Sequence, residues 1–292
     1  MHRVSFTFML TKKLRGGIMA QFGDDPVSAI TEEEAAGQIA EIFADIRDTM
    51  DIPLLTSIWR TLVSVDGGLE AVWAAAKPLY LSGFPQLALA SIATSDDLPV
   101  PKPLLAGQLE SVGLTSEDIT SVRAIVSAYN RSNGMNMLAL SCLLAKPHGD
   151  PLPKPKIENV IHWPPIPRLL PQNEIEPDVW RLLLEINKFG AVEDGALATL
   201  WRHLARWPGF LSILHDVFVP LQRSGDLSKS VQRVHEVSGE LAARMAYLKA
   251  ETVALPVGAH EMVESYVAIP GAVTRMVTLG HAVANWLDSV VE

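Results

Sequence analysis

A string of 27 residues occurs twice in this chain, 142 positions apart. Residues 57–83 align without a gap to residues 199–225, and nine of these positions are identical. The identities are Trp59/Trp201, Arg60/Arg202, Leu62/Leu204, Gly67/Gly209, Leu69/Leu211, Pro78/Pro220, Leu79/Leu221, Ser82/Ser224 and Gly83/Gly225. The period is too long for a solenoid, whose units run to about 20–50 residues. We therefore expect two related domains.

The length and the distribution of proline place the boundaries of these domains. A chain of 292 residues fits two units at about 150 residues per domain. Residues 146–177 hold nine of the 20 prolines, a density that a helix or a central strand does not tolerate. We predict a helical repeat at 30–145, an ordered, partly extended proline-rich linker at 146–177 and a second helical repeat at 178–292. The two repeats are expected to pack as an intramolecular pseudo-dimer.

Helical periodicity dominates the rest of the chain. Residues 31–50 begin with Thr31 and three glutamates and then place apolar residues on one face, which predicts a helix from Thr31 onward. Thr115 followed by Asp118 predicts a capping box at the start of another helix. Residues 176–190 read as a helix that stops at Gly190. Because no convincing alternation of polar and apolar residues is present, the predicted fold class is all-α.

Composition excludes several classes of function. The chain is 48% apolar and 20% charged with a net charge of -9, which favours neither nucleic acid nor another polyanion as a partner. No apolar run approaches the roughly 20 residues of a membrane span. The single Cys142 precludes an intrachain disulfide and fits a reducing compartment, so we expect a cytoplasmic protein. The histidines lack the spacing of metal ligands, so we expect neither a metal nor another cofactor.

The duplicated string also suggests where a ligand could bind. Trp59 and Trp201 are expected to be large core anchors between helices. Arg60 and Arg202 point about 100° away from these tryptophans, so we expect them to be solvated or paired. Clefts between domains are preferred ligand sites. We therefore expect the site to lie between the two repeats, with a homodimer as a further possibility for assembly.

Two segments of the chain resemble a known family. The stretches "IVSAYNRSNGMNMLALSCL" (residues 125–143) and "LWRHLARWPGFLSIL" (residues 200–214), with the duplicated helical layout and the proline-rich join, are similar to the group I 2-haloacid dehalogenases. These bacterial enzymes need no cofactor and hydrolyse both enantiomers of small 2-halocarboxylic acids. The resemblance covers most of the chain and implies an all-α fold with an active site between the repeats.

The resemblance also implies roles for particular residues. In the family, an aspartate of the second repeat activates the water that displaces halide, and an asparagine of the first repeat holds that water or the substrate. Asn133 matches the asparagine, whereas Leu200, preceded by Thr199, stands at the position of the aspartate. Leucine cannot accept a proton from water, so the general base of the family is missing. Leu54 and Ser57 stand where bulky aromatic pocket residues are expected.

Other residues complete the predicted site. His203, three positions after Leu200, is the candidate replacement base, because a neutral imidazole can take a proton near pH 7. Asp194 lies six positions before Leu200 and more than half a turn out of phase with it. Tyr266 aligns with Tyr129 at a shift of 137 residues and is expected to contribute to binding.

Three hypotheses for function follow, and the sequence leaves open whether the protein is an enzyme. The chain could be a hydrolase of the dehalogenase type with a relocated base, which would release halide from 2-chloropropionate. It could have lost that reaction and bind or transform another small, fairly apolar organic acid, which would stabilise the fold without halide release. It could also be a helical scaffold for a protein partner, which would change its mass in light scattering when that partner is present.

The first 18 residues give a test of the expected domain limits. They lack a helical apolar face and precede a second methionine, Met19, so we expect them to form a disordered extension. A chain that begins at Met19 should melt within about one or two degrees of the full chain, because no core contact is removed. A loss of several degrees in differential scanning calorimetry would contradict this expectation.

Overall fold

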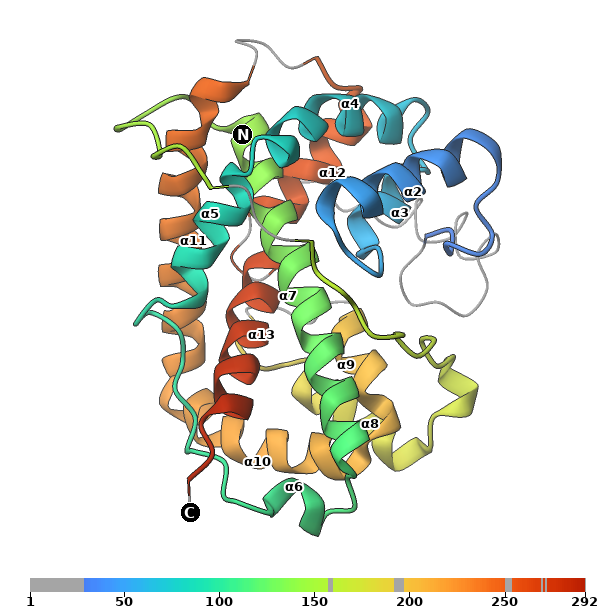
Figure 1. Ribbon diagram of the computed structural model, residues 1–292, viewed down its shortest axis with the longest axis vertical. Coiled ribbons are helices and arrows are strands. Elements are labelled where there is room, and N and C mark those ends of the chain that lie inside the picture. Colours follow the sequence, from blue (N-terminus) through green and yellow to red (C-terminus); the bar gives the residue numbers. More distant parts are fainter. Residues whose placement is uncertain are drawn as a thin grey trace, which may run out of the picture.

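The computed structural model describes residues 29–156, 160–191, 197–249, 254–268, 270 and 272–291. Within these ranges the regular elements are helices, and the only strand-like contact is an isolated bridge between Leu105 and Val291 (Figure 1). The predicted all-α class is therefore confirmed. The predictions for residues 1–18 and Asp194 lie outside the described residues.

The helices follow a similar order in the two halves of the chain. The first half holds α2 (Gly37–Met50), α3 (Ser57–Leu62), α4 (Gly68–Leu81), α5 (Phe84–Ala93), α6 (Gln108–Ser111) and α7 (Ser116–Leu144). The second half holds η1 (Gln172–Glu174), α8 (Pro177–Ile186), α9 (Thr199–His203), η2 (Leu204–Arg206), α10 (Pro208–Ser224), α11 (Asp226–Met245), η3 (Ala246–Leu248), α12 (Val257–Val267) and α13 (Val273–Asp288). Helices α3 and α4 correspond in sequence to α9 and α10. The internal duplication itself stays a prediction.

Two apolar cores lie toward opposite ends of the molecule. The first core includes Trp59, Trp73 and Tyr80, and the second core includes Trp201, Phe210 and Trp286. Both duplicated tryptophans are thus buried core anchors. Each core takes residues from both halves of the chain, because α11 and α13 contribute to the first core and the start of α7 contributes to the second. The two predicted repeats therefore share their cores.

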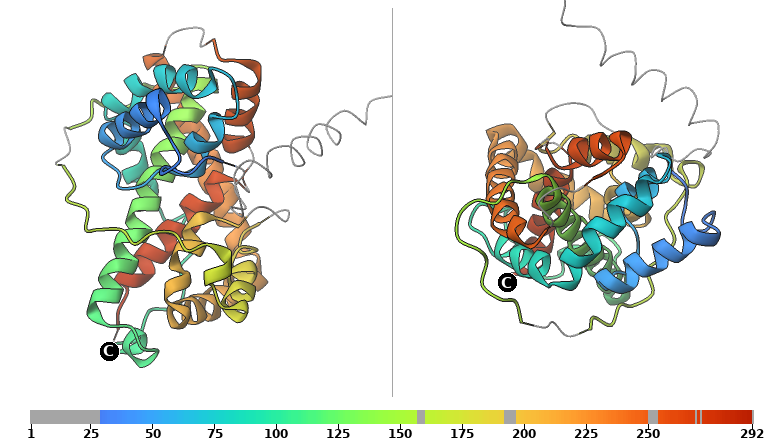
Figure 2. Two further views of the ribbon diagram at one scale, coloured as in Figure 1. Left: turned by 90° about the vertical axis from the view of Figure 1, so that its right-hand side faces the viewer. Right: turned by 90° about the horizontal axis from the view of Figure 1, so that it is seen from above.

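Helix α7 is the element that joins the cores. Residues 122–129 of α7 lie in the second core, and residues 135–143 lie in the first. Helix α13 runs antiparallel beside α7 and likewise passes from one core to the other (Figures 1 and 2). Such a shared helix pair couples the two ends of the fold, because neither core can be completed without α7.

The start of α7 is capped as predicted. The Thr115 hydroxyl accepts a hydrogen bond from the Asp118 amide at 3.1 Å, and the Asp118 carboxylate accepts one from the Thr115 amide at 2.8 Å. The indole of Trp207, from the turn before α10, donates to the same carboxylate at 2.8 Å. Hydrogen bonds from Thr115 and Trp207 lower the pKa of Asp118. The cap therefore also ties the second half of the chain to α7.

The predicted start of the first helix is wrong by six residues. Thr31 and Glu34 do exchange hydrogen bonds in the manner of a capping box, at 2.8 and 3.2 Å. The chain then passes through Gly37, whose φ of +56° lies in the left-handed region, so α2 begins only there. The sequence around Thr31 forms an isolated turn because the left-handed residue interrupts the helical run.

The duplicated arginines are paired, the second of the two expected arrangements, and are not solvated. Arg60 and Arg202 are buried, with 8% and 5% of their surfaces exposed. Their Nε atoms donate to the backbone carbonyls of Ile30 at 2.8 Å and Leu170 at 2.6 Å. Each arginine thus holds the segment that precedes its own half of the fold. These segments cover the short helices α3 and α9. The two arginines are therefore buried although they point away from the tryptophans beside them in the sequence.

The linker crosses the outside of the molecule as an extended strap (Figure 2). The Asp51 carboxylate accepts from the Ile161 amide at 2.7 Å, and the Asp51 carbonyl accepts from the Trp163 indole at 3.1 Å. The backbone amide of His148 donates to Ala243 of α11 at 3.2 Å. These contacts fix the described parts of the strap against both halves.

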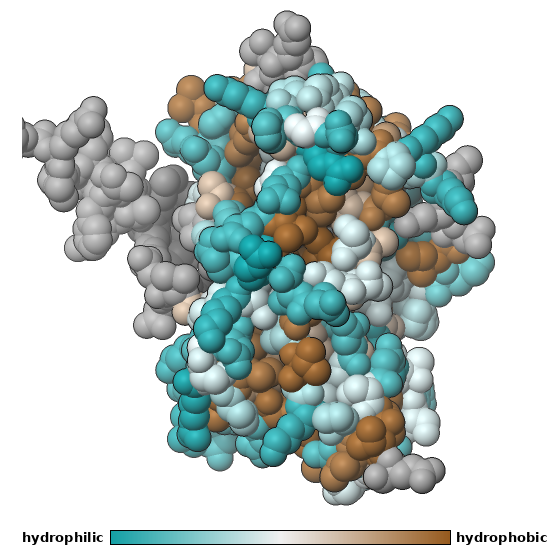
Figure 3. Space-filling view, turned by 90° about the vertical axis from the view of Figure 1, so that its left-hand side faces the viewer, coloured by the Kyte–Doolittle hydropathy of each residue, from teal (hydrophilic) through white to brown (hydrophobic). Residues whose placement is uncertain are grey.

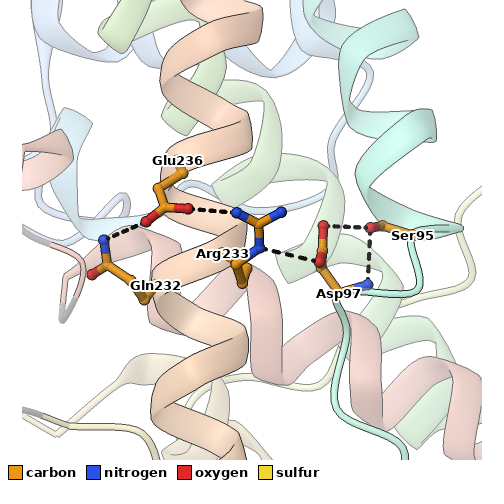
Figure 4. A network of polar contacts seen from close by, with 5 residues as sticks. All are labelled: Ser95, Asp97, Gln232, Arg233 and Glu236. Carbon is orange, nitrogen blue, oxygen red and sulfur yellow. Dashed lines mark hydrogen bonds and ion pairs between the residues drawn. The ribbon is translucent and has the colours of Figure 1, made fainter.

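A polar clip on the surface connects α11 to the turn after α5 (Figure 4). Arg233 lies 3.5 Å from the Asp97 carboxylate and 2.8 Å from Glu236, and Ser95 donates to Asp97 at 3.2 Å. These side chains are partly exposed, so the clip contributes little to stability. The two halves are held together chiefly by burial along α7 and α13.

The surface on the side of α11 mixes small hydrophobic areas with hydrophilic ones (Figure 3). Among the residues drawn in colour there, no single broad apolar area offers an obvious protein interface. None of the helices in the described part of the chain has the length and hydrophobicity to cross a lipid bilayer. The expected homodimer stays a prediction.

Two helical glycines with different surroundings, Gly209 near the start of α10 and Gly239 inside α11, provide a test of the packing. A Cβ atom at Gly209 would lie 2.6 Å from the Val112 carbonyl oxygen, whereas a Cβ at Gly239 would meet nothing within 4 Å. Gly209→Ala should lower the free energy of unfolding by about 1–3 kcal/mol, because backbone must move. Gly239→Ala should raise it by up to about 1 kcal/mol through helix propensity. Shifts of the same sign in urea unfolding would contradict the close approach of Val112 to α10.

Candidate functional site

Polar side chains gather on the middle of α7, between the two cores. Tyr129, Ser132, Asn133 and Asn136 recur three and four residues apart, so they share one face of this helix. All four are buried. Helix α12 and the segment before α3 approach this face from the first core, and α9 approaches it from the second. We call these residues and their polar partners the α7 site.

The predicted residues Asn133 and Tyr266 meet in this site. The Tyr266 hydroxyl of α12 donates to the Asn133 carboxamide oxygen at 3.4 Å. Burial raises the pKa of Tyr266 well above its ordinary value, so the phenol keeps its proton. The structure therefore brings together one residue from each half of the chain, 133 positions apart.

A second amide, Asn136, lies one turn further along α7 and is fully buried. Its carboxamide oxygen accepts from the Trp59 indole at 3.1 Å and from the Tyr80 hydroxyl at 2.8 Å. Its amide nitrogen donates to the Thr56 hydroxyl oxygen at 2.8 Å. Burial also raises the pKa of Tyr80, which keeps that phenol protonated and able to donate. The first-core side of the site is thus a connected polar network.

The second-core side of the site centres on Tyr129. Its hydroxyl lies 3.2 Å from Nδ1 of His203, and the two rings meet edge to face at 5.8 Å between centroids. Thr199, at the start of α9, is a further hydrogen-bond partner of the Tyr129 hydroxyl. Burial raises the pKa of Tyr129 to about 12. Tyr129 therefore acts as a protonated donor that links α7 to α9.

Both ring nitrogens of His203 are engaged. Nε2 is hydrogen-bonded to the carbonyl of Pro167 in the strap, which requires it to carry the proton. Nδ1 is then the acceptor for the Tyr129 hydroxyl. Burial lowers the pKa of His203, so its neutral form is favoured. The lone pair that a general base would use is occupied, and this weighs against the predicted catalytic role of His203.

Charged groups near Tyr129 give this end of the site a positive balance. The charges of Arg60 and Arg202 lower the pKa of Tyr129, and the charge of Glu32 raises it. Two guanidinium groups, one from each half of the chain, thus act on the same hydroxyl together with one carboxylate. A net positive potential favours an anionic ligand over a cationic one.

Leu200 lies in the second core with 1% of its surface exposed. It shares that core with Tyr129 and with Leu54, which belongs to the first half of the chain. The position that the family resemblance assigns to the catalytic aspartate is therefore apolar and buried. Ser57 opens α3 and is partly exposed, and its backbone carbonyl accepts a hydrogen bond from the Thr61 hydroxyl at 3.0 Å.

Sequence reasoning missed five members of the site, namely Tyr129, Ser132, Asn136, Thr56 and Tyr80. The spacing in "YNRSNGMN" could have indicated the three α7 residues, because polar side chains recur there inside an otherwise apolar stretch. Thr56 and Tyr80 carry no such signal. In the described residues no group of three or more His, Cys, Asp or Glu side chains is placed to hold a metal ion.

The environment of His203 predicts a pH dependence of stability. The pKa of His203 is about 6.5 in the unfolded chain and lower in the fold. The contribution of His203 to the free energy of unfolding is therefore present above about pH 6.5, and it is lost as the pH falls through the folded pKa. The difference in unfolding free energy between the native protein and His203→Gln should therefore shrink between about pH 7 and pH 5. Urea unfolding of both proteins measures it, and a constant difference would contradict a neutral buried His203.

Comparisons with known proteins agree with the resemblance seen in the sequence. An (R)-2-haloacid dehalogenase of Pseudomonas putida is 24% identical over 111 residues, which is 36% of this chain and 37% of that protein. A configuration-inverting 2-haloacid dehalogenase of Pseudomonas sp. (strain 113) is 21% identical over 224 residues, covering 72% of this chain and 73% of that protein. No family model matches the chain.

Solved structures show the same relationship at the level of the fold. A D-2-haloacid dehalogenase mutant in complex with D-2-CPA has a TM-score of 0.67 and 15% identity, covering 89% of this chain and 94% of that one. A D-2-haloacid dehalogenase with L-LA has a TM-score of 0.69 and 14% identity, covering 89% and 95%. The family resemblance is confirmed: this chain has the fold of the D-2-haloacid dehalogenases and is a distant relative of the 2-haloacid dehalogenases.

Proposed function

We propose that this protein binds a small organic acid in the α7 site and has lost the dehalogenation reaction of its relatives. The observation that carries the proposal is the environment of Leu200, which is apolar, 1% exposed and unable to accept a proton. In the α7 site, Asn133 and Tyr266 are hydrogen-bonded to each other and supply polar groups that can bind an acid. The relatives act on 2-halo acids, and the ligand class is carried over from them.

The charge around the site supports an acid as the ligand. Arg60 and Arg202 both act on the Tyr129 hydroxyl and outweigh Glu32. Their Nε atoms hold backbone carbonyls, so the guanidinium groups are fixed in place. A carboxylate near Tyr129 would meet this potential without displacing the arginines. The buried surroundings match a small ligand with an apolar body.

A relocated base at His203 is the weaker alternative. His203 could act only through Tyr129, whose hydroxyl occupies Nδ1. Burial raises the pKa of Tyr129 and lowers that of His203, so both shifts oppose transfer of the Tyr129 proton to His203. The scaffold hypothesis has no specific contact in its favour.

The native protein should bind 2-chloropropionate without releasing halide. Binding should raise the melting temperature in proportion to the logarithm of ligand concentration. Ion chromatography should detect no chloride from either enantiomer above the rate of a protein-free control. Halide release by the native protein that is abolished in His203→Ala would overturn the proposal in favour of the relocated base.

Restoring a carboxylate tests the same site from the other direction. Leu200→Asp should release chloride slowly, because the new carboxylate stands where the relatives are inferred to place their base. Leu200→Asn is the matched control, since it has the same shape and no basic oxygen. Both variants should lose several kcal/mol of stability through the buried polar group. Folded Leu200→Asp with no more halide release than Leu200→Asn would count against an open, hydrated site.

A further inference from the structure

We propose that Asn136 is a positioning residue that sets the direction of the hydrogen bonds reaching Asn133, so that Asn133 turns its amide nitrogen toward the ligand. The inference rests on the proposed function, because it concerns the same site. It predicts the kind of group that the ligand must present there. Trp59 is the fixed end of the hydrogen-bond network that leads to Asn133.

The orientation of Asn136 is fixed by its neighbours. An indole N–H can only donate, so the side-chain atom of Asn136 that lies 3.1 Å from Trp59 Nε1 must be the oxygen. Tyr80 donates to the same oxygen at 2.8 Å. The amide nitrogen of Asn136 therefore faces Thr56, and it donates to the Thr56 hydroxyl at 2.8 Å. With no exposed surface, Asn136 has no water available for another arrangement.

Thr56 passes this direction on to Tyr266. The Thr56 oxygen accepts from Asn136 and also from the Ser132 hydroxyl at 3.3 Å. Its own proton is then free to point elsewhere, and Tyr266 is hydrogen-bonded to both Thr56 and Asn136. The Thr56 hydroxyl and the Asn136 amide nitrogen thus donate to the Tyr266 oxygen, which leaves the Tyr266 proton for Asn133. Each hydroxyl in this series of hydrogen bonds both accepts and donates. The donor-to-acceptor direction that Trp59 sets therefore reaches Asn133.

The last member of the network faces the ligand. Because the Asn133 oxygen accepts from Tyr266, the group left for the ligand is the amide nitrogen, which can only donate. The ligand must therefore present an acceptor at this point, such as a carboxylate or carbonyl oxygen. An ammonium or another donor would be opposed by unpaired hydrogen atoms in a buried place. Asn136 selects this polarity without touching the ligand.

Replacing Asn136 by aspartate makes the network switchable. Asn136→Asp keeps the oxygen that faces Trp59 and Tyr80 and replaces the amide donor by a carboxyl group. The protonated acid still donates to Thr56, whereas the ionised acid cannot. Burial raises the pKa of a carboxyl group, so both forms are accessible between about pH 5 and pH 8. Affinity for 2-chloropropionate, which stays ionised over this range, is measured by calorimetry at each pH.

The expected result is a change of affinity with pH that the native protein does not show. At the acidic end, Asn136→Asp should bind within about threefold of the native protein, and at the alkaline end it should bind about tenfold or more weakly. Asn130→Asp is the matched control, because Asn130 is an equally buried asparagine of α7 that lies outside this network. An equal loss in both variants, or none in Asn136→Asp, would overturn the proposal.

A second pair of variants covers the case in which Asn136→Asp does not fold. Thr56→Val removes one of the two hydrogen bonds to the Tyr266 oxygen without adding charge and should weaken binding at every pH, because only Asn136 still orients the Tyr266 hydroxyl. Thr56→Ser keeps the hydroxyl and should restore the affinity. Native affinity in Tyr266→Phe, which lacks the hydroxyl that both Asn136 and Thr56 reach, would overturn the inference.

A readout without ligand separates this inference from the proposed function. The side-chain amide signals of Asn133 in nitrogen-15 NMR, assigned with Asn133→Ser, should shift with pH in Asn136→Asp and stay constant in Asn130→Asp. If the native protein binds neither enantiomer of 2-chloropropionate, the proposed function fails. The Asn133 signals then still show whether Asn136 directs the hydrogen bonds that reach Asn133. Constant Asn133 signals in Asn136→Asp would show that Asn136 does not direct them.

Discussion

The fold depends on the burial of α7 in two cores at once. One end of this helix completes the second core and the other end completes the first, with α13 beside it along both. Its middle therefore lies where the two cores meet, and polar groups placed there are removed from water. A helix shared in this way makes the halves interdependent, since loss of packing at either end exposes apolar surface at both. It also creates a protected site without a deep opening between separate domains.

Buried polar groups are costly unless they are hydrogen-bonded, and the α7 site meets that condition largely through its own members. Asn136 alone connects α7 to Trp59, Tyr80 and Thr56. The pKa values of Tyr80, Tyr129 and Tyr266 are all raised by burial, so the phenols remain neutral donors. The result is a neutral, oriented set of dipoles with fixed guanidinium groups nearby. Such a set is suited to hold an anion in place, and it offers no free base.

The D-2-haloacid dehalogenases and this chain share a fold at about 15% sequence identity. Leu200 lies in an apolar core where the family resemblance implies a carboxylate, and His203 is committed to Tyr129 and Pro167. Fold is retained more readily than chemistry, because packing depends on many contacts whereas proton transfer depends on one group. Binding can outlast the reaction for the same reason, since the groups that hold a carboxylate are separate from the one that activates water.

The sequence alone determined the local and periodic features of this protein. Helical spacing specified an all-α chain, the Thr115 and Asp118 pair specified the start of α7, and Leu200 stands where the family resemblance implies the base. These follow from residues close together in the chain or from a single residue type. Only the tertiary structure decided that Arg60 is buried against a carbonyl, that both nitrogens of His203 are occupied, and that Asn136 belongs to the site. The hydrogen-bond partners of these side chains lie 30 or more positions away, and local patterning carries no information about which distant atoms will satisfy a buried polar group.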